Sequence, residues 1–275
     1  MDVQRVPAAA DNWQGADAYE GYVGRWSRLV AREFLDWLDV GPGRFWLDVG
    51  SGTGALGDAI TGHSRPGMVL AIDRSLAYLV LARSRAGASG TAHTVADGCN
   101  LPVPGGSFDV AVSGLVLNFA DDPARMVHEM VRAVRSAGRV ALYVWDYAGL
   151  MEPIRYFWDA AVALHPAAEA LDEGRRFPIC TPVALRSLFE GAGLIDIDVR
   201  SIDIPALFRD FDDFWTPFLG GQGPAPGYAM SLTDSERQQL RALLRSRLPV
   251  RADGSISLTA RAWGIRSRVA GETQA

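Results

Sequence analysis

The sequence predicts an α/β fold built on a doubly wound, mostly parallel sheet, and two short stretches carry this prediction. The apolar run Phe45–Val49 indicates a buried parallel strand with an acid, Asp48, near its end, and alternating glycines follow it before the next apolar segment. A second apolar run, Met68–Ile72, ends at Asp73, 25 residues beyond Asp48. Strand, tight turn and helix repeated in this order are typical of βαβ units.

The glycines after the first strand indicate a ligand-binding loop. Gly50, Gly52 and Gly54 would let the backbone adopt positive φ and approach a ligand closely. Residues 52–57 also fit G-x-G-x-x-G, so a nicotinamide or flavin enzyme is one interpretation. Asp48 argues against it, because a carboxylate would repel an anionic pyrophosphate and attract a cationic cofactor such as S-adenosylmethionine. Alternatively, Asp48 only hydrogen-bonds the backbone of the turn.

The stretch Leu47–Gly54 closely resembles motif I of class I S-adenosylmethionine-dependent methyltransferases. The nearest branch is the small-molecule one related to quinone-biosynthesis (ubiquinone/menaquinone) C-methyltransferases, although relatives often carry Cys where Ser51 stands. The resemblance is strong over residues 18–145. It implies a Rossmann-like sheet of seven strands in the order 3-2-1-4-5-7-6, with helical cap insertions. It also implies methyl transfer from S-adenosylmethionine to the C, O or N atom of a small, apolar or aromatic acceptor.

The same resemblance assigns roles to individual residues. Asp73 would accept both ribose hydroxyls, Asp97 the adenine amino group, and the Gly98 amide would donate to a ring nitrogen. Arg25 would pair with the cofactor's carboxylate while Tyr22 closes over the site. Asp73 could instead cap the helix that follows it, and Asp97-Gly98 could be only a turn. The predicted cofactor-binding residues are Tyr22, Arg25, Asp48, Gly50, Ser51, Gly52, Gly54, Asp73, Arg74, Asp97, Gly98 and Ser113.

Four residues are candidates for the catalytic side of the site. Asn118 stands where many relatives have His, and an amide can orient a nucleophile but cannot act as a general base. Transfer would then depend on proximity or on a base elsewhere; Asn118 could equally satisfy backbone groups. Asp146 could be such a base and Tyr147 a substrate contact, with capping and core packing as equal alternatives. His165 lies in an aromatic insertion that could cover an apolar acceptor or simply form a core.

The predicted organisation is a disordered leader, residues 1–17, followed by one methyltransferase domain, residues 18–275. Its first part, residues 18–40, would form an N-terminal lid. Residues 148–180 and 205–253 would form cap insertions. The second insertion is either a substrate-covering lid or an oligomer contact.

Element boundaries in the second half follow from turn residues. The sequence predicts a helix beginning at Pro123 and stopped by Gly138, then a strand over residues 140–144. Strands over residues 194–202 and 255–265 would pair antiparallel. A capping box, Thr233 to Glu236, begins a helix inside the second insertion.

Composition narrows the possible functions. With 275 residues and 48% hydrophobic content the chain can bury a full core, and its net charge of −5 argues against a nucleic-acid partner. Two cysteines and four scattered histidines predict no metal site. The absence of a long apolar run predicts a cytoplasmic protein without membrane insertion. The protein is expected to be a monomer or a homodimer. The remaining alternatives are an S-adenosylmethionine-binding enzyme with non-methylating chemistry, a nicotinamide-dependent oxidoreductase, and a noncatalytic binding protein.

Overall fold

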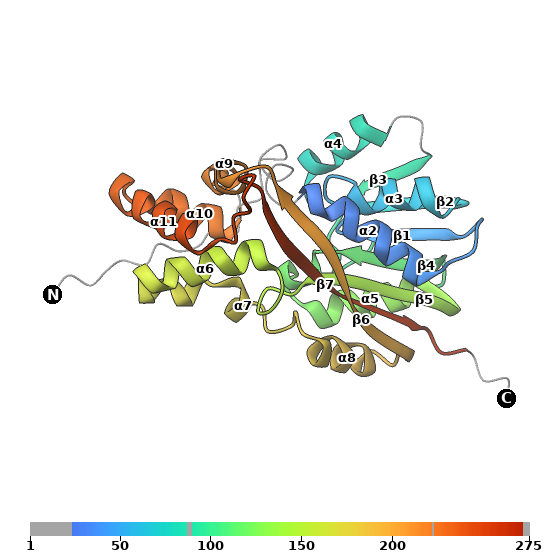
Figure 1. Cartoon of the computed structure of the whole chain (residues 1–275). Helices are drawn as coiled ribbons and strands as arrows, with labels where there is room; N and C mark the ends of the chain where they lie inside the picture. The colour runs from blue at the N-terminus through green and yellow to red at the C-terminus, as the bar shows by residue number, and fades with distance from the viewer. Residues whose placement is uncertain (1–23, 87–89, 222, 272–275) are drawn as a thin grey trace. The chain divides into compact units, whose positions relative to one another are not determined.

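A computed structural model describes residues 24–86, 90–221 and 223–271, and Figure 1 shows how their helices and strands are ordered along the chain. One seven-stranded sheet has the order β3-β2-β1-β4-β5-β7-β6. The first five strands pair in parallel and β7 pairs antiparallel with β5, which confirms the predicted fold class and strand order. The strands are β1 (Phe45–Val49), β2 (Met68–Asp73), β3 (Thr91–Val95), β4 (Phe108–Gly114), β5 (Val134–Trp145), β6 (Ile195–Phe208) and β7 (Ile256–Arg268).

Contacts divide the chain into two compact units. In the described part of the chain, the sheet unit comprises residues 27–86, 90–145, 179–202 and 262–271. The helical unit comprises residues 24–26, 146–178, 203–221 and 223–261. The helical unit therefore takes in both predicted cap insertions almost entirely, whereas the predicted leader lies outside the described residues.

The sheet unit packs amphipathic helices along its strands. In α2, the side chains of Val30, Phe34 and Leu38 are fully buried, four residues apart, and the Phe34 ring lies 4.7 Å from that of Tyr143 in β5. At the start of α5, Asp122 accepts the N–H of Arg125 at 2.9 Å, and Pro123 occupies the first turn. The helices concerned are α2 (Arg25–Leu38), α3 (Ala55–His63), α4 (Leu76–Ala86), α5 (Pro123–Ala133) and α8 (Pro182–Gly191), with the 3-10 turn η2 (Leu117–Phe119).

The prediction that α5 runs to Gly138 was wrong. The helix ends at Ala133 and β5 begins at Val134, where the ladder to β4 is irregular. A Cβ on Gly138 would lie 2.5 Å from Val134 Cγ1 and 2.6 Å from the Asp109 carbonyl oxygen. Gly138 therefore permits a close approach within an irregular strand rather than stopping a helix.

The last two strands are longer than predicted. β6 continues through Pro205 to Phe208. It is an edge strand, and a proline without an N–H is tolerated where no neighbouring strand needs a hydrogen bond. β7 continues to Arg268, where Arg139 of β5 pairs with it. The predicted strand ends at residues 202 and 265 were both too early; in β6 the alternation of buried residues continues through Ile204, Ala206 and Phe208.

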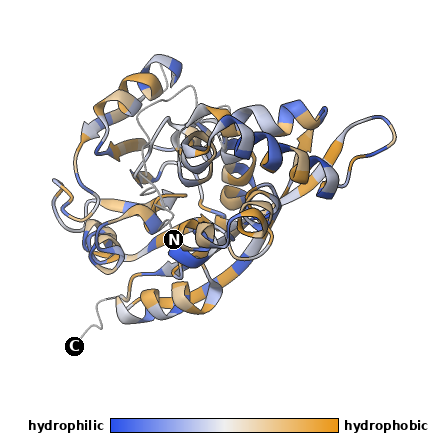
Figure 2. Cartoon of the chain, turned by 90° about the vertical axis from the view of Figure 1, so that its left-hand side faces the viewer, coloured by the Kyte–Doolittle hydropathy of each residue, from blue (hydrophilic) through white to orange (hydrophobic). Residues whose placement is uncertain are grey.

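The helical unit is held together by aromatic side chains. The rings of Phe157 and Phe218 stack at 4.6 Å, and Trp158 and Tyr228 pack edge-on or tilted against Phe157 and against each other. Hydrophobic and hydrophilic stretches alternate along the helices in Figure 2, as expected for helices with one buried face. Helices of this unit are α6 (Glu152–Leu164), α7 (Glu173–Arg176), α9 (Phe211–Trp215), α10 (Pro224–Ser231) and α11 (Asp234–Arg247), with the 3-10 turns η3 (Pro166–Leu171) and η4 (Thr216–Gly220).

The predicted capping box at the start of α11 is present. Thr233 accepts the N–H of Glu236, and the Glu236 carboxylate accepts the Thr233 N–H at 2.8 Å. Within the described residues, no helix is long and apolar enough to span a membrane.

Candidate functional site

The glycine loop follows β1 and is fastened to the neighbouring strand β2. The N–H groups of Gly50 and Ser51 both donate to the Ile72 carbonyl, at 2.7 and 2.9 Å. Gly50, Gly52 and Gly54 have φ values of 74°, 53° and 93°, in the left-handed region that favours glycine. This backbone turns immediately at the end of the strand, which is the geometry that the sequence predicts.

Gly50 also provides space for another segment. A Cβ at Gly50 would lie 2.5 Å from Val116 Cγ1, in the loop that follows β4. The residue before Val116, Leu115, has φ of 64°, a conformation that costs a branched residue roughly 1–2 kcal/mol. The turn after β4 is therefore strained and packs directly against the glycine loop.

Asp73, the acid at the end of β2, holds two backbone groups. Its Oδ2 accepts the Gly52 N–H at 2.8 Å, and its Oδ1 accepts the Ser75 N–H at 2.7 Å. Burial raises the pKa of Asp73, and these two amides together with Arg74 act in the opposite direction. The helix-capping alternative falls instead to Ser75, whose hydroxyl accepts the Tyr78 N–H at 3.3 Å.

Asp48 is the least solvated acid of the site. The residue is 0% exposed, and neither carboxylate oxygen has a hydrogen-bond donor in good geometry among the described residues. Burial, reinforced by the charges of Asp73 and Asp58 and opposed by the Gly57 amide, raises the pKa of Asp48 to about 7. Such a carboxyl group gains most from a cation placed beside it.

Further polar atoms near the same strand ends are buried and have no described partner. They are the Ser51 and Ser113 hydroxyls and the Nδ2 and Oδ1 atoms of the Asn118 side chain. The β1–β4 register pairs Asp48 with Val112, so Ser113, the last residue but one of β4, lies level with Val49 just before the glycine loop. Because parallel strands present ligands at their carboxyl ends, these atoms belong to one edge of the sheet.

Asp97 and Gly98 follow β3, the next strand along the edge. Asp97 Oδ1 accepts the Cys99 N–H at 2.9 Å and the residue remains exposed, as does Arg74 after β2. A Cβ on Gly98 would lie 3.0 Å from Val49 Cγ1, so this backbone passes closely over β1. The predicted Asp97-Gly98 turn thus exists, and its adenine role stays a prediction.

Comparison with known families agrees with this geometry. Residues 47–142, which contain the glycine loop, Asp73, Asp97 and Asn118, match the sequence profile of the methyltransferase domain. The family match therefore covers the part of the chain that holds the glycine loop and the first four strand ends. The predicted family resemblance is thereby confirmed.

Two curated relatives of this chain are methyltransferases named for different acceptors. A malonyl-[acyl-carrier protein] O-methyltransferase from Methylococcus capsulatus is 31% identical over 154 residues, which cover 56% of this chain and 54% of the relative. A ubiquinone/menaquinone biosynthesis C-methyltransferase from Desulfotalea psychrophila is 28% identical over 187 residues, covering 64% of this chain and 74% of the relative. The chain spans about half the length of three of the curated relatives that it matches.

Solved structures share the fold of the methyltransferase domain. One is phosphoethanolamine N-methyltransferase 2 from Haemonchus contortus in complex with S-adenosyl-L-methionine. It superposes with a TM-score of 0.57 at 17% identity, over 96% of this chain and 58% of that chain. At this identity the likeness shows the fold alone.

The other predicted site residues lie in the helical unit or outside the described residues. Tyr22 is among the latter. Asp146 Oδ2 accepts the Leu150 N–H at 2.9 Å, and the buried Tyr147 ring packs 5.4 Å from that of Phe177. His165 Nδ1 lies 2.9 Å from the Tyr228 hydroxyl. Asp146, Tyr147 and His165 therefore each have a local partner within the helical unit, and their catalytic roles stay predictions.

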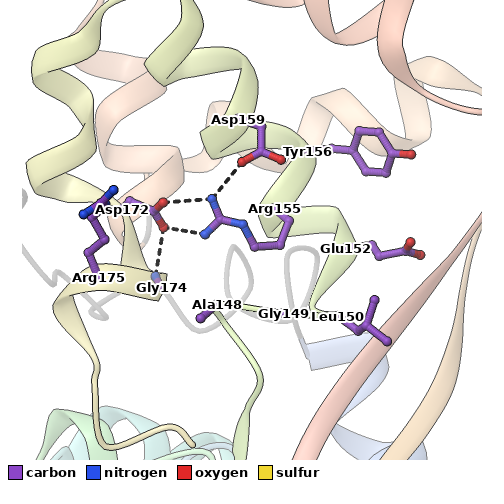
Figure 3. A pocket seen from close by; sticks show the side chains of 10 residues that line it. All are labelled: Ala148, Gly149, Leu150, Glu152, Arg155, Tyr156, Asp159, Asp172, Gly174 and Arg175. Carbon is purple, nitrogen blue, oxygen red and sulfur yellow. Dashed lines mark hydrogen bonds and ion pairs between the residues drawn. The ribbon is translucent and has the colours of Figure 1, made fainter.

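The helical unit also contains a cavity of about 620 Å³ that the sequence did not indicate (Figure 3). Arg155 points into it, and its guanidinium donates to Asp172 at 2.6 and 2.8 Å and to Asp159 at 3.0 Å. The remaining charged lining residues are Glu152 and Arg175. Because Arg155 is committed to two carboxylates, the cavity offers no unpaired guanidinium there.

Proposed function

We propose that the chain binds S-adenosylmethionine at the carboxyl ends of β1, β2 and β3 and transfers its methyl group to a small acceptor. The observation that carries the proposal is Asp48, a fully buried acid without a well-aligned hydrogen-bond donor among the described residues. An unpaired buried carboxylate is unfavourable, and the cofactor's α-ammonium would neutralise it. An anionic pyrophosphate would add a repulsive charge, which disfavours a nicotinamide cofactor.

Asp73 and Asp97 can bind the ribose and the adenine of the cofactor. An ionised carboxylate has about four lone-pair positions, and Asp73 uses two of them for Gly52 and Ser75. The others can accept ribose hydroxyls. Asp97 is exposed after β3 and can accept from the adenine amino group, while Gly98 leaves its backbone close to the strand end. Ser51 and Ser113 offer hydroxyls that have no described partner.

Asn118 is our candidate for positioning the acceptor. S-adenosylmethionine supplies an activated methyl group, so the chain needs to exclude water and align the acceptor atom. The Asn118 amide has a buried donor and a buried acceptor, both without a described partner, next to the strained turn at Leu115. We propose that it hydrogen-bonds a polar group of the acceptor; an amide cannot remove a proton.

The acceptor proposed is a small molecule that is apolar or aromatic apart from such a polar group. The relatives named above methylate carbon in one case and oxygen in another, so the attacked atom is left open. The net charge of −5 favours a small molecule over nucleic acid. Incubating the protein with a metabolite extract and isotopically labelled cofactor methyl would identify the labelled product.

Calorimetry tests the cofactor assignment. S-adenosylmethionine and S-adenosylhomocysteine are expected to bind, and NAD(H) is not. Binding of NAD(H) without S-adenosylhomocysteine would overturn the proposal. Binding of S-adenosylhomocysteine without methyl transfer to any component of several extracts would favour non-methylating chemistry.

A further inference from the structure

The charged face of α5 is bonded to the loop between β3 and β4, within the sheet unit. Arg125, Glu129 and Arg132 are four and three residues apart, so their side chains leave the helix on one face, and the other face is buried. Arg125 Nε donates to the Cys99 carbonyl oxygen at 2.7 Å. A charged helix face commonly meets solvent, whereas this one contacts the backbone of residues 99–103.

Glu129 and Arg132 hold three further backbone groups of this loop. Glu129 Oε2 accepts the Leu101 N–H at 2.8 Å. Arg132 donates to the carbonyl oxygens of Leu101 and Val103, at 2.9 and 2.8 Å. The guanidinium also donates to both Glu129 oxygens, at 2.8 and 2.7 Å, which lowers the pKa of Glu129. The pair is thus bonded to itself and to the loop at once.

The same loop carries Asp97 and Gly98, at the carboxyl end of β3. Asp97 Oδ1 accepts the Cys99 N–H at 2.9 Å, and the Asp97 carbonyl oxygen accepts the Asn100 N–H at 3.0 Å. These bonds connect the turn directly to the anchored residues that follow it. Within the described part of the chain, Asp97 Oδ2 and the Gly98 N–H have no hydrogen-bond partner. The α5 contacts therefore fix the position of one available acceptor and one available donor.

We propose that Glu129 and Arg132 are positioning residues that hold Asp97 and Gly98 in one geometry and so set a preference for adenine. The inference rests on the proposed function, in which the base of the cofactor lies after β3. Adenine offers its amino group to the carboxylate and a ring nitrogen to the amide N–H.

Hypoxanthine reverses both of these groups. It carries an oxygen in place of the amino group and an N–H in place of the ring acceptor, so in the fixed geometry both contacts are unfavourable. A loop that is free to shift would let the Asp97 carboxylate accept the ring N–H instead. Loosening the loop should therefore reduce the preference for adenine, and not only the affinity.

Calorimetry with S-adenosylhomocysteine and S-inosylhomocysteine, which differ only in these groups of the base, measures the preference. The wild type should prefer S-adenosylhomocysteine roughly 5- to 100-fold, the range for polar groups left unpaired. Arg132→Met and Glu129→Ala should each lower this preference by about 2- to 10-fold, the range for one hydrogen bond. Glu129→Gln keeps an amide oxygen for the Leu101 N–H and should retain most of the preference. A purely structural loss would weaken both ligands equally.

Arg139→Met is the matched control. Arg139 also donates to backbone carbonyls, but to those of Leu38 and Asp39 after α2. This variant should lose stability in urea and keep the wild-type preference. The inference is overturned if neither Arg132→Met nor Glu129→Ala lowers the preference, if Arg139→Met lowers it as much, or if the wild type binds both ligands equally. In the last case cofactor binding stands, whereas a wild type that binds neither ligand would contradict the proposed function.

Discussion

The Asp73 carboxylate accepts the backbone N–H of Gly52 at 2.8 Å and so ties the end of β2 to the loop after β1. Its second oxygen accepts the Ser75 N–H at 2.7 Å, at the start of the segment leading into α4. One side chain therefore shapes the glycine loop and presents its remaining lone pairs at the strand ends. Removing it should affect the loop and the proposed ribose contact together.

Asp73→Ala should weaken S-adenosylhomocysteine binding by about 1.5–3 kcal/mol, the range for hydrogen bonds to a charged group. It should also lower the free energy of unfolding by about 1–2 kcal/mol, because two backbone amides lose their acceptor. Calorimetry and urea unfolding measure the two effects. Asp73→Asn keeps a neutral acceptor for Gly52 and should recover most of the stability but less of the affinity. Unchanged affinity in Asp73→Ala would rule out the ribose role.

The cofactor edge was predictable because its signals are local. An apolar run, an acid and alternating glycines define β1 and its loop within ten residues, and the same pattern ending in Asp73 defines β2. The hydrogen bonds that Asp73 makes with Gly52 and Ser75 connect these two neighbouring patterns. The strand order followed from the family resemblance.

Long-range relationships were not predictable from the sequence. Arg25 and Asp213 are 188 residues apart, and nothing in either local sequence indicates that they pair. Gly138 has the features of a helix stop, yet tight packing against Val134 and Asp109 decides its role. The cavity beside Arg155 likewise forms from two segments, around residues 148–159 and 172–175, that fold together only in the helical unit.

The affinity for S-adenosylhomocysteine should rise with pH up to about 7, the pKa to which burial, Asp73 and Asp58 raise Asp48 in the free protein. A bound ammonium favours the ionised carboxylate and therefore lowers this pKa in the complex. Below pH 7, binding must then release a proton, and the affinity should fall by up to about tenfold per pH unit. Calorimetry between pH 5.5 and 8 measures the slope. Asp48→Asn should give a nearly flat profile, and an equally steep profile in that variant would place the titrating group elsewhere.

Asp48→Asn should stabilise the free protein near neutral pH. An acid with a pKa of about 7 when folded and 3.8 when unfolded binds more protons in the folded state between these values. The free energy of unfolding therefore falls as pH rises from about 4 to 7, by at most about 4 kcal/mol for this group. The variant removes that slope. Urea unfolding at pH 5 and pH 7.5 measures the free energy of unfolding of both proteins. The variant should be stabilised more at pH 7.5 than at pH 5. If it is less stable than the wild type at both pH values, Asp48 has an internal partner.

Gly50→Ala should destabilise the protein more than Gly52→Ala. Both glycines have positive φ, which costs an alanine roughly 1–2 kcal/mol. Only at Gly50 would the new Cβ meet another side chain, Val116, whereas Gly52 has nothing within 4 Å. Overpacking should add about 1–3 kcal/mol at Gly50. Urea unfolding of Gly50→Ala, Val116→Ala and the double variant should show that Val116→Ala removes the overpacking cost at residue 50. Equal losses of stability in Gly50→Ala and Gly52→Ala would contradict the contact between residue 50 and Val116.

Arg155→Met should cost the helical unit about 3–5 kcal/mol, because Asp172 would keep a mostly buried charge without its cation. Burial alone lowers the pKa of Arg155, but its hydrogen bonds to Asp172 and Asp159 outweigh burial and raise that pKa above its ordinary value. The Arg155 and Asp172 side chains are 16% and 9% exposed, whereas Asp159 is 65% exposed.

Asp159→Asn should therefore cost no more than about 1 kcal/mol. Adding Asp172→Asn to Arg155→Met should restore part of the stability by removing the unpaired charge, while the amide oxygen can still accept the Gly174 N–H. Urea unfolding of the three variants separates these contributions. Equal losses for Arg155→Met and Asp159→Asn would mean that the Arg155–Asp172 pair is well solvated and contributes little.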